Sequence, residues 1–398
     1  MQYTKGALEG IVVLDLSRVL AGPYCSMILS DMGAEVIKAE IPGKGDDTRG
    51  FPPFKDGKSG YFMNMNRNKK GITLDLKKGK GIFLELVEKA DILIENYRPG
   101  TMEKLGIGYE ELKKINPRLV YGCISGFGHY GPYSSRPGYD IVGQAMSGIM
   151  SVTGWPDGEA TRAGAPVSDA VAGISLAAGV LGALHYAQKT GIGQKVDIAL
   201  VDSIVSVMQI INQIYLIGGR VPGRTGNAYE STAPYDTFPT KDGERVVIGV
   251  ANDKFWKQLC EMMGREDLIN HPDMQKNGDR VKNRDKIKPI VSAWSQTKTS
   301  KELVSQLLEA GIPTAPIYDV KQVSEDPHIA GAREMFVEIE DPEVGKIRVT
   351  NSHIKMSETQ PGFRSPAPGL GEHNQEIYGG LLGYSADKIE QMKADGII

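Results

Sequence analysis

A single carboxylate stands at the start of a long uncharged stretch of this sequence. Asp169 follows Pro166 and Ser168 and precedes the apolar residues 170–188. Proline and serine are common at helix entries, so the pattern places the Asp169 carboxylate near exposed backbone amides, whose dipoles favour its ionised form. An ionised and positioned carboxylate is a potential nucleophile. The same local pattern also fits an ordinary capping acid, so both roles stay open at this point.

Positive side chains with turn-forming neighbours are a second group of candidates. They occur at Lys38, at residues 67–70, and at Arg98 with Lys104. Each of them alone fits a solvated surface. Strand ends are where ligands usually bind in an α/β domain, and cationic side chains there can hold phosphates. The group therefore indicates one anionic ligand held by several segments.

Motifs of several common chemistries are missing. Residues 17–23, after the first apolar run, lack the G-x-G-x-x-G turn of dinucleotide binding, and the chain has no P-loop sequence. Ser125 lacks the preceding glycine of a hydrolase nucleophile elbow. The six histidines show no metal-ligand spacing, and His185 fits a core position better than a base. We therefore expect no metal and no tightly bound cofactor.

Length, charge and cysteine content narrow the class of protein. A chain of 398 residues predicts two or three domains. Its net charge of −3 argues against binding to nucleic acid or to an anionic membrane. Cys25, Cys123 and Cys260 are widely spaced, as in reduced cytosolic proteins. The chain shows no secretory signal and no uninterrupted membrane span, so we expect a cytoplasmic protein.

Short apolar runs alternate with helix-like segments in the first half, which predicts an α/β fold with a largely parallel sheet. The helix expected at residues 170–188 is apolar on all sides, as buried helices are, so Asp169 would open a core helix. The predicted strands are residues 11–16, 35–38, 92–94, 119–125 and 196–200, and the predicted helices are 23–32, 79–90, 109–115, 170–188 and 202–216.

A change of amino-acid composition in the middle of the chain predicts the domain organisation. Residues 218–235 are rich in glycine and arginine and are typical of an exposed linker. We predict a large Rossmann-like domain, built from N- and C-terminal parts, and a small α+β domain. Residues 1–217 form the N-terminal part of the large domain, 236–320 the small domain, and 321–398 a second linker and the return to the large domain. The small domain should contain a strand pair around Asp242 and helices at 253–263, 280–294 and 300–310, followed by a hairpin at 336–349 and a terminal helix at 385–394.

Several motifs then occur in one order along the chain. They are residues 14–23, 33–40, 45–46, 66–76, 95–100, 124–128 and 138–140, then Asp169, and last 191–197. This ordered set resembles the class III coenzyme A transferases of the CaiB/BaiF type, among them the formyl-CoA and carnitine CoA transferases. The resemblance covers the first half of the chain by motif and the rest by size and layout.

The resemblance implies that Asp169 is the nucleophile. Its carboxylate would attack the thioester of a donor acyl-CoA, forming an acyl-aspartyl anhydride and releasing the CoA thiolate. The thiolate would return to give an aspartyl-CoA thioester. A small carboxylic acid would attack that thioester, and CoA would attack the new anhydride to give the product. Coenzyme A and acyl-CoA are then substrates and not bound cofactors.

The resemblance also implies CoA-binding positions and an interlocked homodimer. Each active site would lie between the large domain of one subunit and the small domain of the other, with residues 218–235 as the crossing segment. Lys38 and Lys104 are the expected phosphate partners. The implied CoA-binding residues are Ser17, Arg18, Lys38, the backbone of Ile72, Thr73, Leu74 and Asp75, then Asn96, Tyr97, Arg98, Lys104, Arg136, Pro137, Gly138 and Tyr139.

Two alternatives stay open. The 2-methylacyl-CoA racemases of the same family carry a histidine where this chain has Tyr139, because proton exchange at a carbon needs two acid/base groups. Tyr139 therefore favours acyl transfer over racemisation. His129 is a disfavoured candidate for the missing acid/base group. The other alternative is a non-catalytic CoA-binding scaffold protein.

The acyl donor and acceptor are not fixed by the sequence. Oxalate-specific transferases have a glycine-rich loop where this chain has residues 248–253, so oxalate specificity is doubtful. Apolar residues at Ile248, Val250, Met208 and Ile211 indicate a larger acyl group, although core packing also explains them.

Overall fold

The computed structural model describes residues 6–398 and divides the chain into two compact units. The larger unit contains the described residues up to Gly148, then Ala163–Met208 and Pro327–Ile398. The smaller unit contains Ile149–Arg162 and Gln209–Asp326. Nothing in the sequence pattern separates Ile149–Arg162 from the residues before it.

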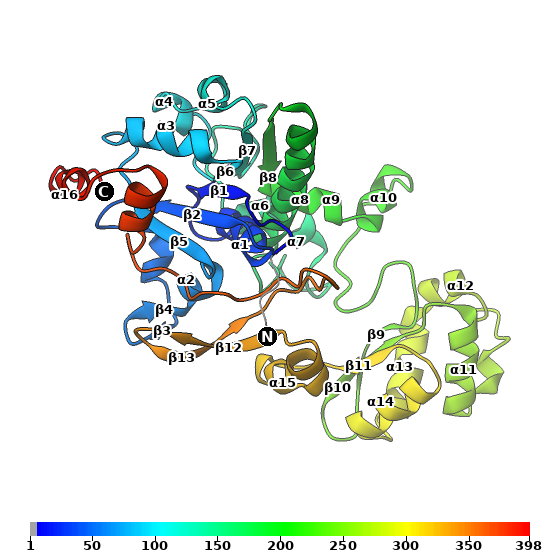
Figure 1. Ribbon diagram of the computed structural model, residues 1–398. Coiled ribbons are helices and arrows are strands. Elements are labelled where there is room, and N and C mark those ends of the chain that lie inside the picture. The colour runs from blue at the N-terminus through cyan, green and yellow to red at the C-terminus, as the bar shows by residue number, and fades with distance from the viewer. Residues whose placement is uncertain (1–5) are drawn as a thin grey trace. The chain divides into compact units, whose positions relative to one another are not determined.

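The larger unit is built on a six-stranded parallel sheet in the order β5-β2-β1-β6-β7-β8 (Figure 1). The central strands are apolar and buried, because helices cover both faces of a parallel sheet. This confirms the predicted α/β class. The strands are β1 (Val12–Asp15), β2 (Glu35–Glu40), β5 (Lys69–Thr73), β6 (Ile92–Glu95), β7 (Val120–Ser125) and β8 (Lys195–Ala199).

One sheet strand, β5, was not predicted. Its sequence begins with Lys69 and Lys70, which we interpreted as part of a cationic turn. Lys69 is fully buried, and its ammonium donates to Asp15 Oδ2 at 3.1 Å and to Asn66 Oδ1 at 3.0 Å. A buried lysine is tolerated only when it is paired in this way, and its partner Asp15 lies 54 residues earlier in the chain.

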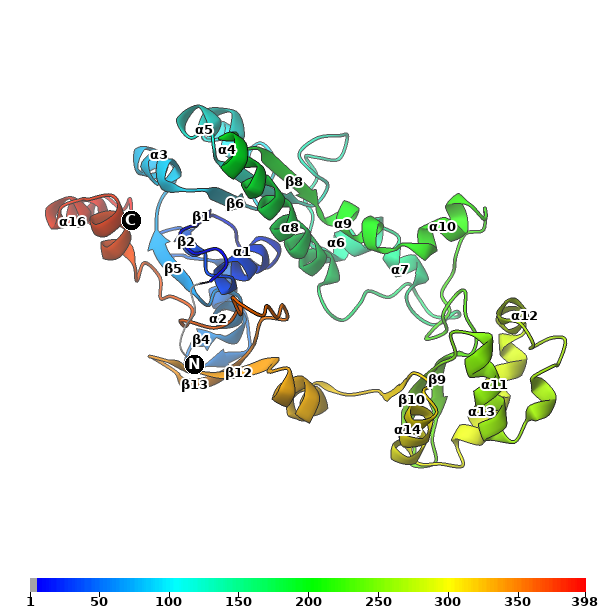
Figure 2. The ribbon, with the colours of Figure 1, turned by 45° about the vertical axis from the view of Figure 1, so that its right-hand side comes forward.

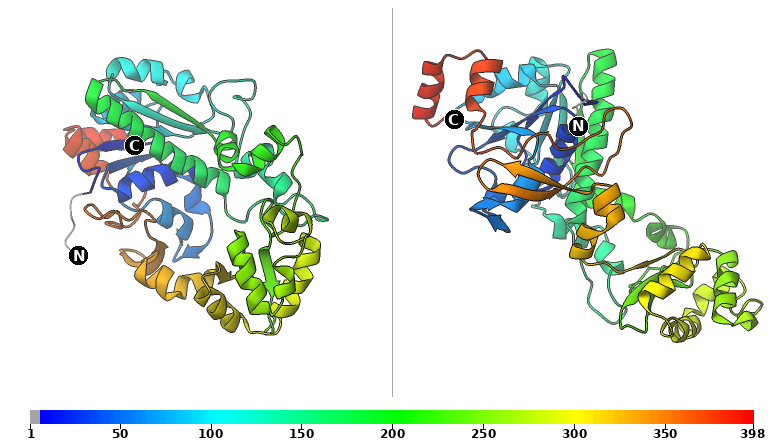
Figure 3. Two further views of the ribbon diagram at one scale, coloured as in Figure 1. Left: turned by 90° about the vertical axis from the view of Figure 1, so that its right-hand side faces the viewer. Right: turned by 60° about the horizontal axis from the view of Figure 1, so that its bottom comes forward.

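Two apolar clusters fill the faces of the sheet. One contains side chains of α3 (Lys80–Lys89), α5 (Tyr109–Ile115) and the C-terminal α16 (Ala386–Ala394). The other contains side chains of α1 (Ala21–Asp31) and α8 (Val167–Thr190). Figures 2 and 3 show α8 as the long green helix across one face, where it packs against α1, β7 and β8.

Helix α8 is long and apolar enough to cross a membrane by length and composition alone. Leu176, Ala177 and Val180 instead pack it onto the sheet, so it is a core helix of a soluble fold. It begins at Val167, three residues before the predicted start, and Asp169 therefore lies within its first turn.

The helix predicted at residues 202–216 is two helices, α9 (Leu200–Val207) and α10 (Ile210–Leu216). Gln209 separates them with φ of 39°. The break has a structural reason, because the chain leaves the larger unit at Met208 and enters the smaller one at Gln209.

The smaller unit packs helices around an antiparallel sheet of order β11-β10-β9. Its core includes Phe238, Trp256 and Leu303. The predicted strand pair is β9 (Tyr235–Pro239) and β10 (Arg245–Gly249), and the predicted helix 253–263 is α11 (Asp253–Met263). The other elements of this unit are β11 (Thr314–Pro316), α7 (Ile149–Val152), α12 (Asn277–Lys282), α13 (Arg284–Ser295), α14 (Ser300–Glu309), α15 (Val320–Glu325) and the short η2 (Glu266–Leu268).

The predicted hairpin at residues 336–349 is β12 (Phe336–Asp341) with β13 (Gly345–Thr350), in the larger unit. The remaining elements of the larger unit are short: β3 (Phe54–Lys55), β4 (Lys58–Ser59), α2 (Gly60–Met65), α4 (Thr101–Lys104), α6 (Asp140–Met146), η1 (Asp47–Gly50), η3 (Pro327–Ala332) and η4 (Gln375–Leu381).

Candidate active site

A cleft of about 390 Å³ in the larger unit is lined by residues that follow β1, β6 and β7. The strand order reverses between β1 and β6, since β1 leads to β2 and β5 on one side and β6 leads to β7 and β8 on the other. Ligands of open parallel sheets bind outside the strand ends at such a point. Of the predicted site residues, the cleft brings together Arg18, Asn96, Tyr97, Arg98, Arg136, Pro137, Gly138, Tyr139 and Asp169.

The amides at the start of α8 are bound by Asp140 and not by Asp169. Asp140 Oδ1 accepts hydrogen bonds from the backbone N–H of Ser168 at 2.9 Å and of Asp169 at 3.4 Å. Gln144 donates to the other oxygen of Asp140 at 2.7 Å. The capping role that the sequence suggested for Asp169 therefore belongs to Asp140, which comes from α6.

The carboxyl group of Asp169 is consequently harder to ionise than we expected. Burial, followed by the nearby charge of Asp140, raises the pKa of Asp169 to about 7. The expectation that the helix entrance favours the ionised form of this group is wrong, because its pKa is raised and not lowered. A carboxylate that lacks solvation is, once ionised, a stronger nucleophile than one in water.

A strained loop forms the wall of the cleft after β1. Val19 has φ of 67°, a conformation that β-branched residues rarely adopt. Asn96 holds the loop from the side, since its Oδ1 accepts from the N–H of Arg18 at 2.8 Å and its Nδ2 donates to the Arg18 carbonyl at 2.7 Å. Asp46 accepts from the N–H of Val19 at 3.3 Å.

Lys38 stabilises this loop through hydrogen bonds and does not line the cleft. Its side chain is fully buried, and its ammonium donates to the carbonyl of Ser17 at 2.9 Å and to Asp46 Oδ2 at 3.0 Å. The structure thus corrects the prediction that Lys38 contacts a phosphate. Ser17 is buried as well, and its hydroxyl donates to Asp15.

The predicted backbone contacts at Ile72, Thr73, Leu74 and Asp75 also lie outside the cleft lining. The C-terminal segment covers this stretch: Asn374 accepts from the N–H of Thr73 at 2.9 Å, and the carbonyl of Ile397 accepts from that of Asp75 at 2.8 Å. The local sequence gives no sign of a partner three hundred residues away. Lys104 is exposed on α4 but does not line the cleft, whereas Thr101 at the start of α4 does.

Several residues of the cleft wall were not predicted from the sequence. Gly126 follows β7 so closely beside Gly138 that a Cβ on Gly126 would lie 2.8 Å from the Gly138 Cα. Two glycines are therefore required there, and their presence in two separate motifs was the available signal. The other unassigned lining residues are Val19, Leu20, Ala21, Asp47, Pro99, Thr101, Ile124, Ser125 and Leu200.

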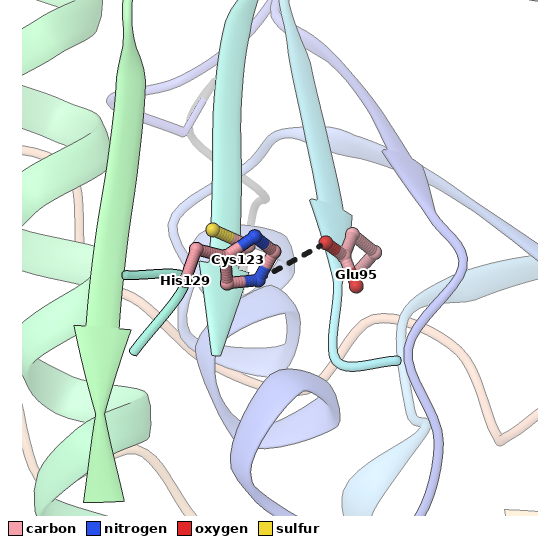
Figure 4. A group of neighbouring side chains, drawn as sticks. All are labelled: Glu95, Cys123 and His129. Atoms are coloured by element: carbon pink, nitrogen blue, oxygen red, sulfur yellow. Dashed lines mark ion pairs between the residues drawn. The ribbon is translucent and has the colours of Figure 1, made fainter. Parts of the chain in front are cut away.

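Behind the cleft lies a group of titratable side chains: Glu95, Cys123 and His129 (Figure 4). Their potential ligand atoms lie within 4.8 Å of one another, a spacing that would admit a metal ion. However, Lys195 Nζ lies 2.9 Å from His129 Nδ1. An ammonium group only donates, so Nδ1 accepts and the ring proton lies on Nε2, the nitrogen that faces Glu95 Oε1 at 3.8 Å. A protonated nitrogen cannot bind a metal, so the group is arranged to hold a proton.

His129 is thereby separated from the cleft chemistry. It does not line the cleft, and its backbone N–H donates to Asp197 Oδ2 at 2.9 Å. Tyr139, at the position where a racemase would carry histidine, does line the cleft and is 75% exposed.

Comparisons with known proteins agree with this geometry. Residues 8–374 match the CoA-transferase family III. The succinyl-CoA:D-citramalate CoA-transferase of Chloroflexus aurantiacus is 37% identical over 98% of this chain and 98% of its own length. The succinyl-CoA:mesaconate CoA-transferase of Haloarcula hispanica is 41% identical over 94% of this chain and 96% of its own.

A solved structure extends the agreement to the fold. The crystal structure of a CaiB/BaiF family protein from Brucella suis superposes with a TM-score of 0.82 at 36% identity, covering 95% of this chain and all of that one. The resemblance that the ordered motifs suggested is therefore confirmed along nearly the whole chain. The chain belongs to CoA-transferase family III, and it is an enzyme that transfers coenzyme A from an acyl-CoA to a carboxylic acid.

Proposed function

We propose that this enzyme transfers CoA from succinyl-CoA to a dicarboxylic acid longer than oxalate, of the size of citramalate or mesaconate, with Asp169 as the covalent nucleophile. One observation carries the assignment of the nucleophile: Asp169 is the acid of the cleft that has no cationic partner in the described part of the chain, whereas Asp47 pairs with Arg18 at 3.4 Å. The substrate class is taken from relatives whose names specify succinyl-CoA with citramalate or mesaconate.

In this mechanism the ionised Asp169 attacks the thioester carbon, and the CoA thiolate leaves. The thiolate attacks the aspartyl carbonyl of the anhydride and releases succinate, which leaves CoA bound to Asp169 as a thioester. The acceptor carboxylate displaces CoA, and CoA then attacks the acceptor's acyl carbon. Asp169 returns as a carboxylate, and no net proton is taken up or released.

Trapping the intermediates tests this proposal. Incubation with succinyl-CoA followed by hydroxylamine or borohydride should modify one peptide, the one that contains Asp169, as read by mass spectrometry. Transfer should be observed from succinyl-CoA to citramalate or mesaconate, with oxalate as the comparison acceptor. Turnover without any modification at Asp169 would contradict the mechanism, and transfer restricted to oxalate would contradict the substrate class. Exchange of an α-hydrogen without an acceptor would instead indicate a racemase.

Arg98 is the cleft cation best placed to bind the CoA phosphates. Within residues 6–398, its guanidinium has no hydrogen bond or ion pair, whereas Arg136 stacks 3.6 Å above the Tyr133 ring. Replacing Arg98 by alanine should raise KM for the acyl-CoA by about 10-fold or more, the worth of one charge-assisted hydrogen bond, with kcat little changed. Steady-state kinetics measure this, and Arg118→Ala, which removes an exposed arginine outside the cleft, is the control. An unchanged KM would place the phosphates elsewhere.

Asp140 should contribute to the pH at which the enzyme becomes active. Because Asp169 must be ionised to attack and its pKa lies at about 7, kcat should rise with pH through that value. Burial and, after it, the charge of Asp140 raise the pKa of Asp169, so Asp140→Asn should move this limb part of the way to lower pH. Asparagine keeps an oxygen that can cap α8. Asp47→Asn removes a different cleft carboxylate and should leave the limb in place. If Asp140→Asn does not move it, Asp169 is not the group that titrates.

We further propose that two chains form an interlocked homodimer in which the small domain of one subunit completes the cleft of the other. In a single chain, only 44% of the most apolar 18-residue stretch of α8 is buried. Exposed apolar side chains also lie on α9, which packs against α8 in the larger unit, and clustered exposed apolar side chains are typical of an interface. They are Ile174 and Tyr186 of α8 and Val205 and Val207 of α9.

In this dimer, residues 1–217 and 321–398 would form the large domain, 236–320 the small domain and 218–235 the crossing segment. Light scattering should give a mass about twice the 43.2 kDa of one chain. A fully active monomer would rule the arrangement out. The three cysteines are all buried and free, which supports a cytoplasmic location.

A further inference from the structure

Glu95 connects the end of β6 to the cleft. It is 1% exposed and directly precedes Asn96 and Tyr97, which line the cleft. Glu95 Oε2 accepts the backbone N–H of Tyr97 at 2.7 Å, and Oε1 accepts the hydroxyl of Tyr121 at 3.1 Å. The carboxylate thus fixes the first peptide of the turn that presents Tyr97 and Arg98 to the ligand.

His129 faces the same carboxylate from the loop after β7 (Figure 4). Its Nε2 is buried and has no hydrogen-bond partner among residues 6–398, although Glu95 Oε1 lies only 3.8 Å away. The charged and titratable groups packed around the pair are Tyr121 and Cys123 from β7, Lys195 and Asp197 from β8, and Glu103 from α4.

Glu95 and His129 differ in how strongly each holds a proton. Burial raises the pKa of Glu95 to about 7. Burial, and after it the charge of Lys195, lowers the pKa of His129, so the imidazole is neutral and offers its Nε2 proton. Near neutral pH the titrating group is therefore Glu95. When Glu95 is ionised, its oxygens accept hydrogen bonds from Tyr97 and Tyr121, and they can accept a third from His129 Nε2 if that nitrogen moves closer. When Glu95 is protonated, one of its oxygens carries the proton and must donate a hydrogen bond.

We propose that Glu95 is a positioning residue for the CoA cleft, whose ionised carboxylate holds the turn of residues 96–98 in the shape that binds CoA and whose protonation weakens that binding. This inference rests on the proposed CoA transfer through the same cleft. Glu95 does not line the cleft. It acts through the backbone of Tyr97 and, one residue on, through the position of Arg98.

Calorimetric titration of CoA from pH 6 to pH 8.5 tests the proposal. The titration uses the full chain carrying Asp169→Asn, so that Asp169 does not titrate. From pH 8.5 to pH 6, affinity in this parent should fall about 5- to 20-fold further than in the same protein with Glu95→Gln, as expected for hydrogen bonds to a charged group. The CoA phosphate titrates equally in both proteins, so the difference between them belongs to Glu95. Glu88→Gln, at an exposed acid of α3 outside the cleft lining, should behave like the parent.

A second variant keeps the test decisive if Glu95→Gln folds poorly. Tyr121→Phe removes a donor that stabilises the ionised carboxylate, so the loss of CoA affinity should begin at higher pH than in the parent. The same pH dependence in parent, Glu95→Gln and Tyr121→Phe would overturn the inference while leaving the transferase intact. Failure of the wild-type enzyme to bind CoA at any pH would overturn the proposed function itself.

Discussion

Replacing Asp169 by asparagine should abolish CoA transfer and, at pH 8, make the protein more stable. The carboxamide cannot form the anhydride or the aspartyl thioester, so kcat should fall by about 10⁴-fold or more, as when covalent nucleophiles are removed from other enzymes. Asparagine has nearly the same shape, and the cap on α8 comes from Asp140, so the fold is retained. Binding of CoA should persist.

The gain in stability follows from the direction of the pKa shift. The pKa of Asp169 is about 7 in the folded chain, above the ordinary 3.8, so the folded state holds the proton more tightly than the unfolded state. Its favourable contribution is complete below pH 3.8 and is lost as the pH rises to about 7. Because the side chain is partly exposed, the resulting destabilisation at pH 8 is about 1–3 kcal/mol. Asparagine removes it.

Denaturant unfolding at several pH values measures this difference. At pH 8, Asp169→Asn should unfold at a higher denaturant concentration than the wild type. The difference in free energy of unfolding should shrink as the pH falls toward 3.8. Asp202→Asn, at an exposed acid of α9, should show no such trend. Retained turnover would mean that another group is the nucleophile. A loss of stability at pH 8 would mean that the Asp169 carboxylate is stabilised by its surroundings.

The predictable part of the fold is the part in which burial follows from local composition. The apolar runs of β1, β6 and β7 and the turn residues between them indicate a parallel sheet without further information. The strand β5 was missed because Lys69 looks solvated in isolation. Only the tertiary structure reveals that Asp15 and Asn66 share its charge.

The same limit applies to the candidate site. The motifs named Asp169, Asn96 and Tyr139 correctly as neighbours of one cleft. They did not show that Asp140, 28 residues before Ser168, occupies the helix entrance. Desolvation and long-range pairing set the pKa of a carboxyl group, and both arise only when distant segments meet.

Replacing Lys38 by methionine should destabilise the protein by about 3–5 kcal/mol, the usual loss when one member of a buried ion pair is removed. The pair is fully buried on both sides, and Lys38 Nζ lies 3.0 Å from Asp46 Oδ2. Lys38 holds the pKa of Asp46 below its usual range, against the opposing effect of burial. Without Lys38, Asp46 must either remain charged without its counter-ion or take up a proton. Thermal and denaturant unfolding at neutral pH measure the loss.

A double-mutant cycle separates this supporting role from the phosphate contact that the sequence suggested. If Lys38 acts on the loop through Asp46, then adding Asp46→Asn to Lys38→Met should recover part of the lost stability, because the uncompensated charge is gone. If Lys38 were instead a phosphate ligand, Lys38→Met would raise KM for acyl-CoA with unchanged stability, as we expect of Arg98→Ala. Both side chains are cations of one sheet, since Lys38 lies within β2 and Arg98 follows β6. Lys38 is buried and stabilises the strained loop at Val19, whereas Arg98 lines the cleft and is free to bind the ligand.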